Sequence, residues 1–131
     1  MVVDWTDEFQ NWLDRLEAKA DDGDRIAERQ VEYIDAAISV LTDLSEPPSE
    51  DTAVVMRVRQ RRKYPIWRVS HPFDEEVAVR LIVWFPEGST AGVIVAFGGD
   101  KKRIGDAFYI SAGSRADAAI EQWLQERSQE S

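Results

Sequence analysis

The sequence predicts an α+β fold: an N-terminal helical hairpin packs on a mainly antiparallel sheet of about four strands, and a C-terminal helix follows. Two observations predict it. Apolar residues recur at helical spacing in residues 1–46 and 114–127, whereas residues 52–100 contain short alternating or continuous β-branched runs. The expected order is two helices, four strands and one helix. Grouped helices and strands are typical of an α+β domain rather than of repeated βαβ units.

Two amphipathic helices are expected in residues 1–46. Asp4 or Thr6 can cap the first helix, because their side-chain oxygens can accept hydrogen bonds from its first N–H groups. The second helix begins near Asp24 and ends before the paired prolines of SEPPSED, which cannot continue a helix. The short connection between them predicts an antiparallel hairpin. The apolar stripe of the first helix consists of Trp5, Phe9, Trp12, Leu13 and Leu16.

Four strands are expected between residues 52 and 100. The first alternates apolar and basic residues from Val54 to Arg59, and the second is the short run IWRV at 66–69. The third is VAVRLIVWF at 77–85, and the fourth is AGVIVAF at 91–97, joined to it by a turn, PEGST. Strands this continuously apolar are usually central in their sheet and covered by helices.

The C-terminal helix is expected at residues 114–127, with the sequence SRADAAIEQWLQER. Ser114 and Asp117 resemble a capping box, with Asp in place of the usual Glu. No internal repeat or linker divides the chain, and its length suits one domain, residues 1–131.

Composition excludes several classes of protein. There is no cysteine, which rules out disulfides and thiolate metal sites, and a single histidine, His71, rules out a metal site built on two histidines. No apolar run approaches the roughly 20 residues of a membrane span. The N-terminus lacks the basic start and apolar stretch of a signal peptide. A cytoplasmic protein without a membrane partner is therefore expected.

The net charge of −9 is unevenly distributed along the chain. Residues 1–51 contain 15 acidic and 4 basic residues, whereas residues 52–110 contain 10 basic and 6 acidic ones. The acidic segment is either a solvated helical face or a surface that mimics nucleic acid. The basic segment is the one that can attract a polyanion.

The cations of the basic segment fall into two clusters beside aromatic residues. One is RVRQRRK at 57–63, next to Tyr64, and the other is KKR at 101–103, six residues before Tyr109. Such clusters suit single-stranded nucleic acid, because cations hold phosphates while rings stack on bases. The alternative for the first cluster is protection of an edge strand against aggregation. The candidate RNA-binding residues are Arg59, Arg61, Arg62, Lys63, Arg80 and Lys101.

Arg80 is the one charge inside the apolar run at 77–85. Burying an unpaired charge is very costly, so Arg80 must face solvent or have a partner. Two arrangements satisfy this requirement: a functional groove on an open sheet face, or an ion pair with the acidic residues at 74–76.

Taken together, the elements resemble the RelE/ParE/HigB superfamily of toxins from bacterial toxin–antitoxin pairs. The family pattern is two helices, a strand ending in Arg, a strand with an internal Arg, an apolar strand, a basic turn and a C-terminal helix. The resemblance covers about residues 4–127. The matching segments are IWRV (66–69), VRLIVWF (79–85), VIVAF (93–97) and KKRIGDAFY (101–109).

The resemblance implies a metal-independent endoribonuclease that needs no cofactor and cleaves mRNA, on the ribosome in some branches. A 2′-hydroxyl attacks the adjacent phosphate, and clustered cations stabilise the charge that develops there. The implied partner is a cognate antitoxin, expected to be a helix-turn-helix protein. The alternative is a non-catalytic member: a gyrase inhibitor of the ParE branch or an inactive homologue. The implied catalytic residues are Arg68, Lys102, Arg103 and Tyr109.

Overall fold

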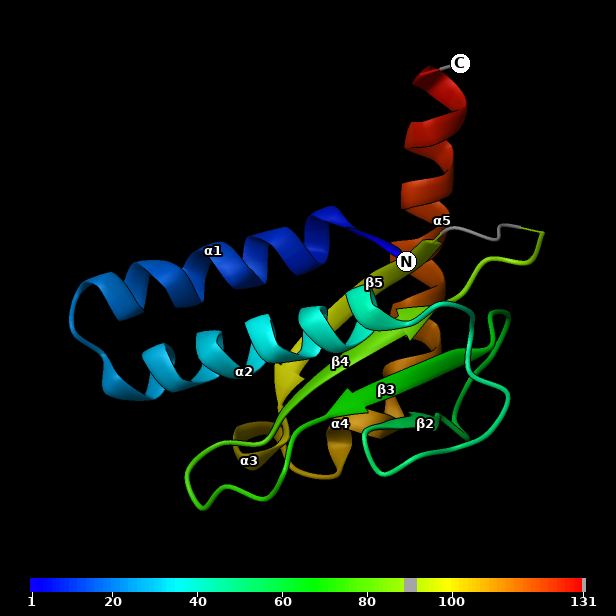
Figure 1. Cartoon of the computed structure of the whole chain (residues 1–131). Helices are drawn as coiled ribbons and strands as arrows, with labels where there is room; N and C mark the ends of the chain where they lie inside the picture. Colours follow the sequence, from blue (N-terminus) through cyan, green and yellow to red (C-terminus); the bar gives the residue numbers. More distant parts are fainter. Residues whose placement is uncertain (89–91, 131) are drawn as a thin grey trace.

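The computed structural model describes residues 1–88 and 92–130 and has the α+β architecture that the sequence predicts (Figure 1). Within these residues, one sheet has the strand order β1-β5-β4-β3-β2, and only the β1–β5 pair is parallel. The predicted apolar strands, β4 and β5, are indeed interior. The elements are β1 (Val2–Trp5), α1 (Asp7–Asp21), α2 (Arg25–Asp43), β2 (Val55–Arg57), β3 (Ile66–Ser70), β4 (Val79–Trp84), β5 (Gly92–Asp100), α3 (Lys101–Ile104), α4 (Ala107–Ile110) and α5 (Ala112–Glu130).

Strand β1 is the one strand of the described residues that the sequence pattern does not reveal. Trp5 belongs to β1 rather than to the first helix, and Thr6 is the N-cap of α1, where its hydroxyl accepts the Phe9 N–H at 3.2 Å. The same hydroxyl donates to the Ala96 carbonyl at 2.6 Å, which ties the start of α1 to β5. The four-residue β1 pairs with a strand about 90 positions away, so no local periodicity marks it.

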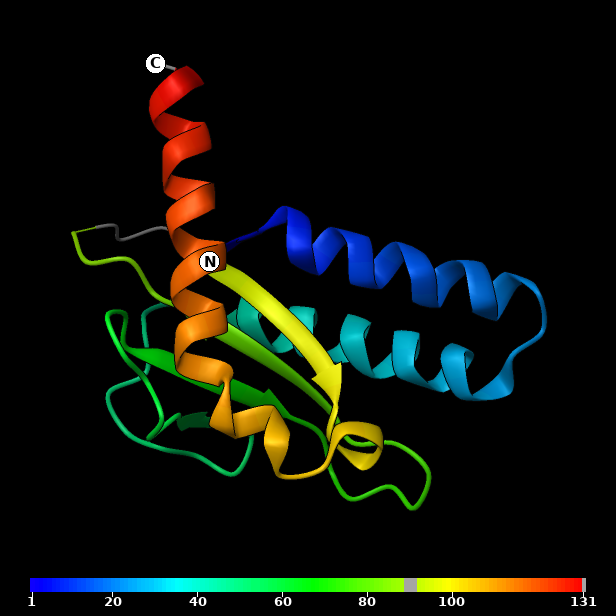
Figure 2. The ribbon, with the colours of Figure 1, turned by 180° about the vertical axis from the view of Figure 1, so that it is seen from behind.

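Helices cover both faces of the sheet. The α1–α2 hairpin packs on one face, where Phe9, Ile34 and Leu81 belong to one buried cluster. Helices α4 and α5 lie on the opposite face, as the reverse view shows (Figure 2), and Ile82 and Ile120 belong to the cluster on that side. Successive residues of a strand point to opposite faces, so β4 contributes to both clusters.

Two glycines at the end of β5 allow close packing on both faces. A Cβ at Gly98 would overlap the ring of Trp12 on α1, and a Cβ at Gly99 would lie 2.7 Å from the ring of Phe108 on α4. Glycine is used where backbone and ring must approach this closely. Strand β5 runs to Asp100, and most of the segment 101–109, which the resemblance matches to a basic turn, forms α3 and α4.

Helix α5 begins two residues earlier than predicted, and the expected capping box is wrong. Ser114 lies inside α5, and its hydroxyl donates to the Ser111 carbonyl at 3.2 Å. Asp117 accepts the backbone N–H groups of Lys63 and Tyr64 at 3.1 and 3.2 Å, so it holds the 58–65 loop against α5. The Asp117 carboxylate, which was expected to cap α5, thus binds the backbone of the 58–65 loop instead.

Residues 89–91, which include part of the predicted PEGST turn and the first residue of the predicted fourth strand, lie outside the described residues. In the described part of the chain, no helix is both long enough and apolar enough to cross a membrane.

Candidate active site

The centre of the candidate site is a hydrogen bond between Arg68 and Tyr109. Nη1 of Arg68 donates to the Tyr109 hydroxyl at 3.0 Å, and its guanidinium carbon lies 5.4 Å from the centre of the phenol ring. Nζ of Lys101 lies 5.4 Å from the same ring. Three elements, β3, α3 and α4, thus bring two cations to one tyrosine, and all three side chains are half-buried.

Local structure explains how Arg68 and Tyr109 meet. On β3, Arg68 lies between Trp67 and Val69, which are buried against the helical hairpin, so the alternation of the strand turns Arg68 to the α4–α5 face. On α4, Tyr109 follows Phe108, whose buried ring packs against Phe97 at 5.7 Å between centroids. The buried neighbours of Arg68 and of Tyr109 therefore fix the positions of the guanidinium and of the phenol hydroxyl.

Lys101 is positioned by Asp100, a buried carboxylate that the sequence analysis did not single out. Asp100 is 5% exposed and accepts the backbone N–H groups of Ala78 and Lys102 at 2.8 and 3.0 Å. It also accepts hydrogen bonds from Gln30 at 2.8 Å and Arg103 at 2.7 Å. A carboxylate with four donors is well compensated for burial. The only sequence signal was an Asp directly before a short basic segment, where it can act as an N-cap.

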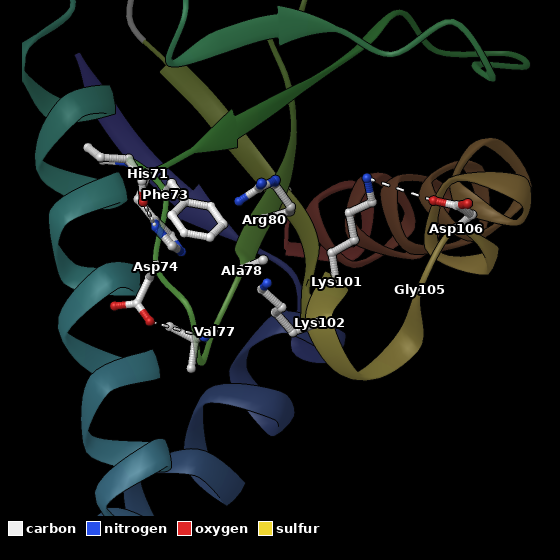
Figure 3. Close-up of a pocket in the computed structure, with 11 residues that line it drawn as sticks. His71, Phe73, Asp74, Val77, Ala78, Arg80, Lys101, Lys102, Gly105 and Asp106 are labelled. Carbon is white, nitrogen blue, oxygen red and sulfur yellow. Dashed lines mark hydrogen bonds and ion pairs between the residues drawn. The ribbon is translucent and has the colours of Figure 1, made fainter.

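Two pockets that contain several cations lie near Tyr109. The Arg80 pocket has a volume of about 400 Å³ and is lined by Arg80, Lys101 and Lys102 together with the 71–74 turn (Figure 3). The Arg68 pocket has a volume of about 310 Å³, and its lining includes Arg57, Arg59, Arg68, Met56 and Tyr109. Tyr109 lines the Arg68 pocket, and Lys101, whose Nζ lies 5.4 Å from the Tyr109 ring, lines the Arg80 pocket.

Arg80 does not form the ion pair that was one of its two expected arrangements. Arg29 lies 3.2 Å from Asp74, and both Arg25 and Arg29 lie 3.5 Å from Glu76. Arg80 Nη1 instead donates to the Val79 carbonyl at 2.9 Å, and its guanidinium lines the pocket. Arg80 lies diagonally opposite Arg68 in the β3–β4 pair, so the two side chains are on the same face of the sheet. Arg80 thus lines a pocket instead of pairing with the acidic residues at 74–76.

Arg103 lies apart from Tyr109, although the resemblance places both in the catalytic set. Its guanidinium donates to Asp100 at 2.7 Å and to the Glu76 carbonyl at 3.0 Å. It lines a third hollow, on the hairpin side, rather than either cationic pocket. Within helix α3, Lys101 and Lys102 therefore line the Arg80 pocket, whereas Arg103 lies outside it. The sequence could not predict which of the three consecutive cations lines the pocket, because their directions depend on where α3 begins.

The basic cluster at 57–63 is also divided by the fold. Arg59 lines the Arg68 pocket, whereas Lys63 lies 2.7 Å from Glu121 of α5, which raises the Lys63 pKa through a side-chain hydrogen bond. Arg61 and Arg62 are exposed and line neither cationic pocket. Of the six predicted RNA-binding residues, Arg59, Arg80 and Lys101 are thus brought to the site, and the other three are not.

The arrangement can bind and polarise a phosphodiester. The Tyr109 oxygen accepts the Arg68 hydrogen bond, and no acceptor for its own proton lies within reach in residues 1–88 and 92–130. Cations fixed around a phosphate stabilise the charge that develops during phosphoryl transfer. In the same residues, no group of three or more His, Asp or Glu side chains is placed to hold a metal ion.

Comparisons of the chain with protein-family models, with curated proteins and with solved structures found no match.

Proposed function

We propose that this protein is the toxin of a toxin–antitoxin pair and cleaves single-stranded mRNA as a metal-independent endoribonuclease in the cytoplasm. The observation that supports this best is the Arg68–Tyr109 hydrogen bond, with Lys101 over the same ring. Two cations and a phenol with a transferable proton meet on the α4–α5 face of the sheet, close to two cationic pockets. Arg68 has no carboxylate partner among the described residues, and its guanidinium donates to the Tyr109 phenol and to the Met56 sulfur.

The proposed reaction is an internal transesterification. The 2′-oxygen attacks the adjacent phosphorus while the bond from phosphorus to the 5′-oxygen breaks, leaving a 2′,3′-cyclic phosphate and a 5′-hydroxyl. The 2′-hydroxyl proton passes to water, and Tyr109 donates its proton to the departing 5′-oxygen and then regains one from water. Arg68 and Lys101 stabilise the pentacoordinate phosphorane-like transition state. In this proposal Lys101 takes the position that the resemblance gives to Arg103.

Expression in a bacterium followed by mapping of mRNA 5′ ends tests the proposal. We expect growth arrest with discrete new 5′ ends that Tyr109→Phe and Arg68→Ala remove. The purified variants should cleave about 100-fold more slowly, the lower range for loss of a proton donor or an electrostatic group. Arg61→Ala is the matched control, because it removes an exposed cation that lines neither cationic pocket, and it should cleave at the wild-type rate.

Other outcomes contradict the proposal. Growth arrest with intact mRNA and trapped gyrase–DNA complexes would indicate a gyrase inhibitor. No arrest and no cleavage, in a protein that melts cooperatively, would indicate an inactive homologue. The proposal also includes an antitoxin, which we expect to be a small helix-turn-helix protein from a neighbouring gene. Its co-expression should restore growth by covering the two cationic pockets.

A further inference from the structure

The turn at 71–77 presents an aromatic ring at the rim of the Arg80 pocket. Phe73 is 83% exposed, and Nζ of Lys102 lies 5.1 Å from the centre of its ring. A single exposed apolar side chain is ordinary on a protein surface. Phe73 differs because it lines a pocket together with three cations, and the guanidinium of Arg80 points to the side of that pocket where Phe73 lies (Figure 3).

The turn that carries Phe73 is anchored on both sides. Before it, the His71 ring stacks on Tyr33 of α2 with centroids 3.6 Å apart, and its Nε2 accepts the Val79 N–H at 2.9 Å. After it, Asp74 accepts the Tyr33 hydroxyl at 2.8 Å and the Arg29 guanidinium at 3.2 Å. The ring of Phe73 is therefore presented by a built turn, which lowers the entropic cost of stacking a ligand on it.

Arg80 of this pocket has an unused hydrogen-bond donor. The Nε atom of Arg80 is buried and has no hydrogen-bond partner among the described residues. The two acidic residues of the pocket do not neutralise Arg80: Asp74 is engaged by α2, and Asp106 lies 3.9 Å from Lys101. An under-satisfied guanidinium strongly favours an anionic acceptor, and phosphate oxygens match its geometry.

We propose that the Arg80 pocket is a nucleotide subsite for single-stranded RNA, in which Arg80 and Lys102 bind a phosphate and Phe73 stacks on the attached base. A volume of about 400 Å³ suits a ligand of this size. Stacking uses the face that every base has, so the subsite positions the strand with little sequence preference. The inference rests on the proposed function, because Lys101 connects this pocket to Tyr109.

Binding of an uncleavable probe tests the subsite without requiring catalysis. The probe is a 2′-O-methyl RNA tetranucleotide that contains 2-aminopurine, whose fluorescence is quenched by stacking. The wild-type protein should quench it, and Phe73→Ala should bind about tenfold more weakly with the quenching lost, since base–aromatic stacking accounts for such a factor. Phe73→Tyr keeps the ring and should behave as the wild type does. Val2→Ala, which shortens another exposed apolar side chain on β1, is the matched control.

The outcomes separate this inference from the proposed function. If Phe73→Ala binds and quenches as the wild type does, the subsite is wrong even where Tyr109→Phe abolishes cleavage. If the wild type binds no probe, the subsite is likewise wrong. Stacking that depends on Phe73 in a protein that cleaves no RNA would support the subsite and refute the endoribonuclease. Arg80→Ala should also weaken binding at least fivefold, and an unchanged affinity would overturn the phosphate assignment.

Discussion

At the scale of single residues, two carboxylates that the sequence analysis did not select, Asp100 and Asp74, position the segments that form this site. Asp100 holds the start of α3, and Asp74 holds the turn that carries Phe73. The pKa of Asp74 is lowered to about 2, first by the hydrogen bond from the Glu76 N–H, then by that from Tyr33 and by the charge of Arg29. The same hydrogen bond raises the pKa of Tyr33. By sequence alone, Asp74 is one acidic residue of a polar turn and Tyr33 one residue of an amphipathic helix, so neither stands out.

Asp74→Asn should make the protein less stable at neutral pH, and the difference should disappear in acid. The carboxyl titrates near 3.9 in an unfolded chain and near 2 in the folded protein. Its stabilising contribution is therefore complete above about pH 4 and is lost as the pH falls from about 4 to 2. Urea denaturation between pH 7 and pH 2.5 measures this. The difference between wild type and variant should shrink below about pH 4, to about a third of its neutral value at pH 2.5, and vanish only below the folded pKa of about 2.

The matched control for this measurement is Glu75→Gln, which changes an exposed carboxylate in the same turn. Its side chain has no hydrogen bond or ion pair within residues 1–88 and 92–130, so its stability should follow the wild type throughout. A stability difference between Asp74→Asn and wild type that stays constant down to pH 2.5 would contradict the assignment.

At the scale of elements, the close approach of α1 and α4 to β5 sets the geometry of the site. Gly98→Ala should cost about 2 kcal/mol of unfolding free energy, because the added methyl group overlaps Trp12. The double variant Trp12→Leu/Gly98→Ala should lose less than the two single changes together, since the smaller side chain leaves room. Urea denaturation of the four proteins gives the coupling. Strict additivity would mean that the two residues do not compete for space.

Elements are also where sequence patterns were most and least informative. The amphipathic stripes and the apolar runs of β4 and β5 are local, so hairpin, strands and C-terminal helix could be predicted. Strand β1 and helices α3 and α4 could not be. Strand β1 depends on a distant partner, and α3 on a buried cap, Asp100, whose donors come from α2, α3 and the segment before β4. Each of these three elements has only four residues, which is too few for a periodic pattern to indicate contacts with distant segments.

At the scale of the whole molecule, charge is segregated between an acidic N-terminal segment and a basic face of the sheet. Strand alternation turns Arg68 and Arg80 to the sheet face opposite the helical hairpin, although the molecule as a whole carries a charge of −9. An acidic hairpin repels polyanions, so we expect the proposed RNA substrate to approach from the α4–α5 face.

The affinity for the uncleavable RNA probe should fall with salt in proportion to the number of phosphates neutralised. In the two proposals, Arg68 and Lys101 bind one phosphate and Arg80 and Lys102 bind a second. Two phosphates predict a slope of about −1.4 in log affinity against log salt, at about −0.7 per phosphate of a single strand. Titrations between about 50 and 200 mM salt give the slope. Lys102→Ala should reduce its magnitude by up to about 0.7, whereas Arg61→Ala should leave it unchanged. A slope near zero would exclude binding through these pockets.

By itself the sequence determined the α+β class, the helical hairpin, the central strands and the presence of two basic clusters, because these follow from local periodicity and composition. Only the tertiary structure decided which cations share a site. Lys101 and Arg103 are two residues apart, yet one faces Tyr109 and the other is held by Asp100. The direction of a side chain at the end of a strand depends on caps and packing partners from distant segments. Residue type and spacing do not indicate which distant segments supply those caps and packing partners.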